Sequence, residues 1–330
     1  MKLGLDLYSV RSQPWNALQK LDYCKRLGVD VAHFGLGDLG ATGDDAMARV
    51  KAHAGALGLE IELGMGSICE SSTTFDPAGG SAVAQTRHAL DIAAQLGSRV
   101  LKVLLGNAAD RRTAVPLATH IENCVATLRA VRDQALGLGI TLAVENHGDL
   151  LGREVAALIE AAGPDFVGAC LDPGNSVALA EDPLVTFEHV APYIVASHIR
   201  DSVVWPHPRG AAFQWVALGD GNVGLPALAR RYQTECSAAA FTLEILTGMP
   251  PRVLPYLDDG YWQAFAERPA WEAARFERLV RQGQPYMGTM VVVARDVDVP
   301  NEYREALRAQ QLYDVERSVA CAGTKLCIGG

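Results

Sequence analysis

Residues 140–147, ITLAVENH, form a short apolar run that ends in polar side chains, and three later runs repeat this form. They are FVGACLDPGN (166–175), YIVASHIRD (193–201) and FTLEIL (241–246). Runs of this length and content are typical of buried strands. At the points where the strands would stop stand Glu145, Asp172, His198 and Glu244. Three carboxylates and one imidazole make a donor set suited to a divalent cation such as Mn, Mg, Co or Zn.

The preceding part of the chain alternates apolar runs with longer amphipathic ones. Further strands are expected in LGLDLY (3–8), VDVAHFG (29–35), LEIELGM (59–65) and RVLKVLLG (99–106). Several of the helix-like stretches between strands end in Leu-Gly, a common helix C-cap. Eight strands that alternate with helices predict an α/β fold, a (β/α)8 TIM barrel. The rival architecture, a doubly wound sheet, would need a glycine-rich phosphate turn after the first strand, and LYSVRSQPW has none.

The barrel is expected to occupy residues 1–250. Residues 251–330 then form a C-terminal helical extension, which packs on the barrel or on a partner subunit. The stretch 202–224, after the seventh strand, is interpreted as a long loop on the active face. Its aromatic residues Trp205 and Trp215 suit contact with a sugar or with the barrel itself.

Composition excludes several classes of protein. The chain has 330 residues, 49% hydrophobic and 20% charged, which is typical of a soluble globular protein. A net charge of -9 argues against nucleic acid as a partner, and no apolar run is long enough for a membrane span. The start, MKLGLDLYSV, does not read as a secretion signal, and the seven scattered cysteines indicate thiols in a reducing compartment. We therefore expect a cytoplasmic protein.

The strand ends of such a barrel form its active face, so the four expected metal ligands can converge on one ion. His147, two residues beyond Glu145, is a candidate general acid or base, or else a loop histidine bonded to a carbonyl group. Lys102 lies inside an apolar run, where it points into the barrel mouth toward a substrate or carboxylate, or marks a misplaced edge.

Two further residues are candidates for substrate binding. Arg200 could hold a substrate oxygen, or pair with Asp201 at the surface. Asn175 could bond a substrate hydroxyl, although the N-cap of a helix is the stronger interpretation. His33, at the end of the second expected strand, is interpreted as a core histidine.

At VENH (Glu145), CLDPGN (Asp172), SHIRD (His198) and LEI (Glu244), the chain resembles the xylose-isomerase-like TIM-barrel superfamily over residues 1–250. This superfamily includes ketose epimerases, inosose dehydratases, hydroxypyruvate isomerases and the metal-bearing subunit of C-glycoside deglycosidases. The resemblance implies that these four residues are the metal ligands and that the metal is Mn2+.

One departure from this pattern favours a particular reaction. Ketose epimerases carry a histidine three residues after the strand-six aspartate, where this chain has Asn175. The chain has His147 instead, similar to the deglycosidase arrangement. The resemblance thus implies metal-dependent proton abstraction beside a sugar carbonyl, in a lyase that cleaves a 3-keto-glycoside at a carbon–carbon or carbon–oxygen bond. His147, Glu145 and Glu244 would be its catalytic residues.

The alternative is a sugar isomerase or epimerase acting on a ketose, with Glu145 and Glu244 working from opposite faces. The deglycosidase resemblance also implies a small second subunit. Barrels of this group often associate, so we expect an oligomer in which the extension is a candidate contact.

Overall fold

The structure is a computed structural model that describes residues 1–40, 42–265, 267–293 and 297–329. Eight parallel strands form one sheet in the order β10-β1-β2-β3-β4-β5-β6-β7. These strands are β1 (Leu3–Asp6), β2 (Val31–Gly35), β3 (Glu60–Ser67), β4 (Val100–Leu104), β5 (Thr141–Glu145), β6 (Val167–Leu171), β7 (Ile194–Ser197) and β10 (Phe241–Leu243). A single bridge between Ile199 and Leu243 joins the two edges, so the sheet closes into a barrel.

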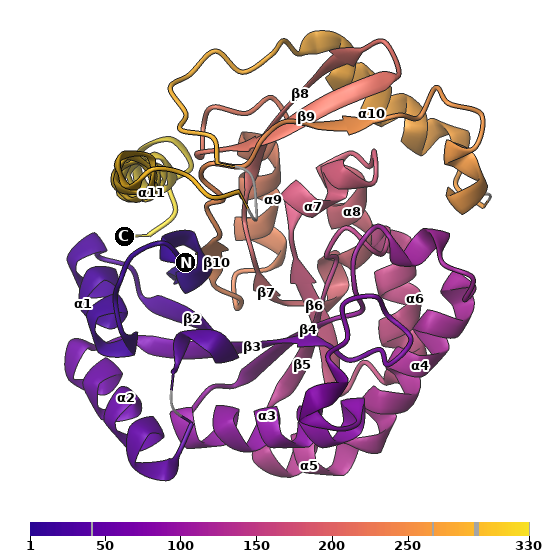
Figure 1. Ribbon diagram of the computed structural model, residues 1–330. Helices are drawn as coiled ribbons and strands as arrows, with labels where there is room; N and C mark the ends of the chain where they lie inside the picture. Colours follow the sequence, from indigo (N-terminus) through magenta and orange to yellow (C-terminus); the bar gives the residue numbers. More distant parts are fainter. Residues whose placement is uncertain (41, 266, 294–296, 330) are drawn as a thin grey trace.

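Helices surround this barrel (Figure 1). The α-helices are α1 (Ala17–Leu27), α2 (Asp44–Leu57), α3 (Ala82–Leu96), α4 (Leu117–Ala130), α5 (Arg132–Leu138), α6 (Gly152–Ala162), α7 (Pro173–Ala178), α8 (Pro183–Val190), α9 (Leu225–Glu235), α10 (Ala270–Gln282) and α11 (Asn301–Lys325). Short 3-10 helices are η1 (Leu7–Val10), η2 (Leu36–Asp38), η3 (Pro77–Gly79), η4 (Asp110–Arg112), η5 (Ala191–Tyr193) and η6 (Tyr261–Phe265).

Local sequence explains where these elements stop. Helices α1 and α3 end at Gly28 and Gly97, which have φ of 73° and 80°, a left-handed conformation that glycine adopts without strain. Strand β6 is buried at every position, as expected for a parallel strand covered on both faces. The (β/α)8 prediction is confirmed, and all eight expected runs contain a strand of the barrel.

The prediction of a long loop after the seventh strand is wrong. Strands β8 (Asp201–His207) and β9 (Gly210–Val216) form an antiparallel hairpin, and β11 (Arg252–Leu254) adds a third strand to it. Apolar residues of this small sheet, Val204, Phe213 and Leu254 among them, share a separate core with α10. The hairpin lies above the barrel in Figure 1, and residues of β9 and β11 border the cavity at the strand ends.

Helix α11 packs on the barrel. Its buried residues Val315 and Ala322 belong to the same hydrophobic core as the strands, and Thr247, just after β10, donates a hydrogen bond to Asp314 at 2.8 Å. The division of the chain near residue 250 into barrel and extension stays a prediction. In the described part of the chain, no helix is long and apolar enough to cross a membrane.

Candidate metal centre and active site

A cavity of about 710 Å³ opens at the C-terminal ends of the strands. Its lining includes most residues expected at the site: Lys102, Glu145, His147, Asn175, His198, Arg200 and Glu244. The chain therefore brings together side chains that are up to 142 positions apart, from Lys102 to Glu244. The remaining candidate, Asp172, is fully buried beside them and does not border the cavity.

The strand-end positions are as expected. Glu145 is the last residue of β5, and Asp172, His198 and Glu244 each directly follow β6, β7 and β10. Backbone hydrogen bonds hold two of these ends in register, from His198 N to Leu171 O at 2.9 Å and from Glu244 N to Ile199 O at 3.0 Å. The side chains consequently converge because adjacent parallel strands end at the same edge.

Two permanent cations already lie among the carboxylates. Lys102 Nζ, from the middle of β4, is 2.9 Å from Glu145 Oε2. Arg200 contacts Asp172 closely and lies 2.8 Å from Glu244 Oε2. The lysine thus points into the barrel mouth, and the surface pairing considered for Arg200 with Asp201 is wrong, because Arg200 is buried among three acidic groups.

His198 joins the acidic residues into a possible metal site. Its Nδ1 lies 3.4 Å from Glu244 Oε2 and 3.7 Å from Glu145 Oε1. Ligand atoms of these three residues lie within 4.8 Å of one another, and all three residues are buried. Oxygen and imidazole donors at this spacing fit a divalent ion. Among the described residues, Glu145 Oε2 and Glu244 Oε2 also have no hydrogen-bond partner, although both have ion pairs.

Asp172 does not belong to that three-residue group. Its Oδ1 accepts a hydrogen bond from the backbone of Asn175 at 3.0 Å, and its Oδ2 accepts one from the Asn175 side chain at 2.7 Å. Asp172, not Asn175, is therefore the N-cap of α7, which corrects the N-cap interpretation of Asn175. The Asn175 amide also reaches Glu145 Oε1 at 3.2 Å, so it braces two of the predicted ligands.

The closely spaced charges of the site shift the pKa values of its carboxyl groups in opposite directions. Burial, followed by the Glu244 and Glu145 carboxylates, raises the pKa of Asp172 well above its usual value, despite the Arg200 guanidinium. Burial would also raise the pKa of Glu244, but Arg200 and His198 overcome it and lower that pKa to about 2. The same balance, with Lys102 as the main cation, holds the pKa of Glu145 well below normal. Glu145 and Glu244 are thus anionic, as metal ligands must be.

His147 has a defined tautomer. Its Nδ1 lies 2.7 Å from the carbonyl oxygen of Gly106, which can only accept, so Nδ1 carries the proton. The backbone N of His147 donates to the buried Asp149 at 2.9 Å, which fixes the loop after β5. Nε2 is then the basic nitrogen of a side chain that borders the cavity. The interpretation as a loop histidine bonded to a carbonyl group is thus confirmed, and the role of His147 as an acid or base stays a prediction.

Sequence reasoning missed two residues of this cavity, Asp6 and His33. Asp6 ends β1, and His33 lies in β2 with Asp6 as its register partner. His33 is buried, as a core histidine would be, but its side chain borders the cavity and lies 3.3 Å from Glu62 Oε2. Asp6 stands at a strand end like the four predicted ligands, so the same rule applied to the first strand would have found it.

The small antiparallel sheet contributes part of the cavity wall. Trp215 of β9 borders the cavity, with the guanidinium carbons of Arg200 and Arg252 at 5.1 and 4.5 Å from its ring. Its Nε1 donates to Gly174 O at 3.1 Å, which ties the hairpin to α7. The expectation that an aromatic residue of this segment shapes the pocket is met by Trp215.

Residues 21–248 match the family described as Xylose isomerase-like TIM barrel. This match covers more than half of the chain, and the chain belongs to that family. The family resemblance expected from the four strand-end motifs is thereby confirmed.

Sequence identity to individual known proteins is low. A 155-residue stretch is 27% identical to 3-oxo-isoapionate decarboxylase of Pectobacterium atrosepticum, which covers 47% of this chain and 49% of that protein. The chain thus spans about half the length of this relative. Among solved structures, a D-psicose 3-epimerase in the presence of D-fructose aligns over the whole of both chains, with 15% identity and a TM-score of 0.64. A xylose isomerase-like TIM barrel protein from Mycobacterium smegmatis in complex with magnesium aligns over 84% of this chain and 96% of its own, with 17% identity and a TM-score of 0.59. At such identities, these two structures establish the fold alone.

Proposed function

We propose that this protein is a divalent-metal-dependent enzyme that removes a proton beside the carbonyl group of a sugar, and that it cleaves a 3-keto-glycoside by elimination. The observation that carries the proposal is the His147 tautomer. Its Nδ1 donates to Gly106 O at 2.7 Å, which leaves Nε2 as the nitrogen that can accept a proton at the cavity. A general base in this form contributes about 10²–10⁴-fold to a proton transfer.

Glu145, His198 and Glu244 would hold the metal ion, whereas the fourth predicted ligand, Asp172, lies outside this group as the N-cap of α7. The ion, expected to be Mn2+, supplies Lewis-acid stabilisation of the negative charge that develops on the carbonyl oxygen. Lys102 and Arg200, buried beside these carboxylates, add fixed positive charge at the same place. The Asn175 amide, which borders the cavity, holds Glu145 and could orient a substrate hydroxyl.

In this reaction His147 Nε2 takes the proton from the carbon between the ketone and the glycosidic carbon. The electron pair of that C–H bond forms the new carbon–carbon double bond, and the bond to the aglycone breaks with its own electron pair. The proton on His147 then returns to the leaving group, so the elimination needs no further reactant. The name of the Pectobacterium relative, a decarboxylase of a 3-oxo compound, supports a ketone at this position of the substrate.

A sugar isomerase or epimerase is the second candidate, since Glu145 and Glu244 approach His198 from different strands. Both carboxyls, however, have pKa values lowered by the neighbouring cations Lys102 and Arg200 against the effect of burial. A carboxylate with such a low pKa is a weak base. His147, with Nδ1 bonded to Gly106 O and Nε2 available at the cavity, is therefore the preferred candidate base, which favours the lyase.

Product analysis tests the proposal. Metal-loaded protein is incubated with a 3-keto-C-glucoside, with and without a small candidate subunit, and compared with the His147→Ala variant. Metal-dependent release of the aglycone, lost in the variant, would support the lyase. Interconversion of free ketoses without any release would instead support the isomerase.

A further inference from the structure

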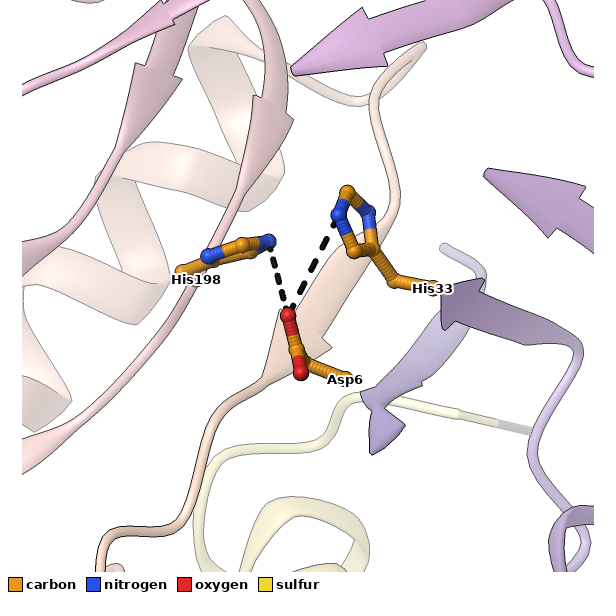
Figure 2. A group of neighbouring side chains, drawn as sticks. All are labelled: Asp6, His33 and His198. Carbon is orange, nitrogen blue, oxygen red and sulfur yellow. Dashed lines mark ion pairs between the residues drawn. The ribbon is translucent and has the colours of Figure 1, made fainter. Parts of the chain in front are cut away.

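Asp6, His33 and His198 form a second group of potential metal ligands, of which the proposed function uses only His198. Asp6 Oδ2 lies 3.2 Å from His198 Nε2 and 4.0 Å from His33 Nε2. One ligand atom from each residue lies within 4.8 Å of the other two. Figure 2 shows one oxygen of the Asp6 carboxylate joined by dashed ion-pair lines to both imidazole rings. We propose that these three residues bind a divalent transition-metal ion of borderline softness, such as Co2+ or Zn2+, at a second site that shares His198 with the group of Glu145 and Glu244.

His33 gives the strongest support. Its side chain is 1% exposed, and its Nε2 has no hydrogen-bond partner among the described residues. A buried polar atom without a partner is costly, and a metal ion would satisfy it. The other ring nitrogen, Nδ1, lies 3.3 Å from Glu62 Oε2. With the Nδ1 proton donated to Glu62, Nε2 carries the lone pair that a metal needs, and the carboxylate orients the ring.

His198 has the same arrangement on its own ring. Its Nε2 is directed at Asp6, whereas its Nδ1 lies 3.4 Å from Glu244 and 3.7 Å from Glu145. Each imidazole of the group thus has a carboxylate behind it, which is the usual environment of a metal-bound histidine. Two imidazoles and one carboxylate are donors typical of iron and zinc sites that keep open positions for substrate.

The space around these ligands is kept free by Gly64 of β3. A Cβ atom at this position would lie 2.7 Å from His33 Nε2 and 2.9 Å from Lys102 Cε, closer than real contacts allow. Asp6, His33, Gly64 and His198 all border the cavity. An ion bound here would therefore be reachable from the same cavity as the site of Glu145 and Glu244.

The two groups share one imidazole, and this gives the proposal a thermodynamic signature. We call Asp6, His33 and His198 the nitrogen-rich group, and Glu145, His198 and Glu244 the oxygen-rich group. A neutral imidazole has one lone pair, so His198 offers either Nε2 to the nitrogen-rich group or Nδ1 to the oxygen-rich group. Occupation of the two groups is therefore competitive. Mn2+, which prefers oxygen ligands, should weaken the apparent affinity for Co2+, and Co2+ should weaken that for Mn2+ by the same factor.

The test is a pair of metal titrations on the full-length protein after removal of metal with a chelator. Co2+ binding is followed by its visible absorption bands, and Mn2+ binding by the electron paramagnetic resonance signal of the free ion. His33→Gln should weaken Co2+ binding by about tenfold or more and leave the Mn2+ dissociation constant within about twofold, because His33 serves only the nitrogen-rich group. Asp6→Asn, a second variant in case the first does not fold, should also weaken Co2+ binding by about tenfold or more.

His53→Gln is the matched control, because His53 is a surface histidine paired with Asp22 at 2.7 Å, far from the cavity lining. It should leave both titrations unchanged. Equal Co2+ binding in wild type and His33→Gln would overturn the proposal, as would a thiolate-to-cobalt charge-transfer band in the near ultraviolet. A loss of Mn2+ but not Co2+ binding in Asp6→Asn would also overturn it, since Asp6 would then act only by orienting His198. None of these readouts depends on turnover, so they stand apart from the proposed reaction.

Discussion

Replacement of Lys102 by methionine tests the charge balance of the site. Lys102 Nζ and Glu145 Oε2 are 2.9 Å apart, with side chains that are 13% and 1% exposed. At an effective dielectric constant of about 20, their attraction is about 6 kcal/mol. Burial lowers the pKa of Lys102, but Glu145 raises it by more, so the ammonium stays charged. Loss of one partner from a buried pair typically costs about 3–5 kcal/mol, because the other charge is left uncompensated.

The expected result is a large loss of stability that metal partly restores. In a protein of 330 residues, a loss of about 3–5 kcal/mol corresponds to a fall in Tm of about 4–7 °C. Thermal unfolding followed by circular dichroism, in the presence of a chelator, measures it. Saturating Mn2+ should recover part of the lost stability. The ion would neutralise the Glu145 carboxylate in place of Lys102, and its binding stabilises the folded state by mass action.

Lys2→Met provides the matched control. Lys2 forms an ion pair with Glu60 at 2.5 Å, but both side chains are more than half exposed, so its loss should cost at most about 1 kcal/mol. A fall in Tm that is equal in the two variants would refute the claim that Lys102 neutralises a buried Glu145. A Lys102→Met variant that is unaffected by Mn2+ would refute the placement of the metal beside that carboxylate.

Three further predictions concern the site and the fold. Glu244→Gln should reduce turnover by about 10²-fold or more and weaken Mn2+ binding with an unchanged circular dichroism spectrum, since a bound ion supplies several kcal/mol; retained turnover would contradict the metal site. His147→Ala should lower kcat by about 10²–10⁴-fold while the Mn2+ dissociation constant stays within about twofold; lost metal binding would mean that His147 is a ligand. Burial raises the pKa of Glu181 to about 7, so the neutral form stabilises the fold and this contribution is lost as pH rises from about 4.5 to 7. In urea unfolding, the free energy of unfolding of the wild type should fall by about 3 kcal/mol relative to that of Glu181→Gln over that range. Parallel pH profiles of the two free energies would contradict this prediction.

The barrel could be predicted because each strand leaves a strong local signal. Runs such as 166–172 are apolar throughout, and the helices between strands end at glycines such as Gly28. The hairpin of β8 and β9 was not predicted because Pro206 and Pro208 interrupt its pattern, and its third strand comes from residues 252–254. Pairing between segments so far apart has no signature in a short window of sequence.

Part of the site could also be predicted, because the strands that carry it leave a strong local signal. Strand ends locate Glu145 and His198, since topology alone brings such ends together. Contacts within the site depend instead on side-chain directions. The capping of α7 by Asp172, the bond from Asn175 to Glu145 and the tautomer of His147 all follow from local loop geometry. Only the first of these has a sequence signal, since Asp before Pro is typical of a helix start.

The central claim is that His147 removes a proton beside a sugar ketone in a metal-dependent step. The most direct measurement is mass spectrometry and NMR of the products formed in deuterated water from a 3-keto-C-glucoside, with Mn2+-loaded protein and with chelator-treated protein. The account predicts released aglycone only with metal, and none with His147→Ala. An epimerised sugar with deuterium but without release would contradict the lyase, and cleavage that is unchanged by chelator or in His147→Ala would contradict the claim itself.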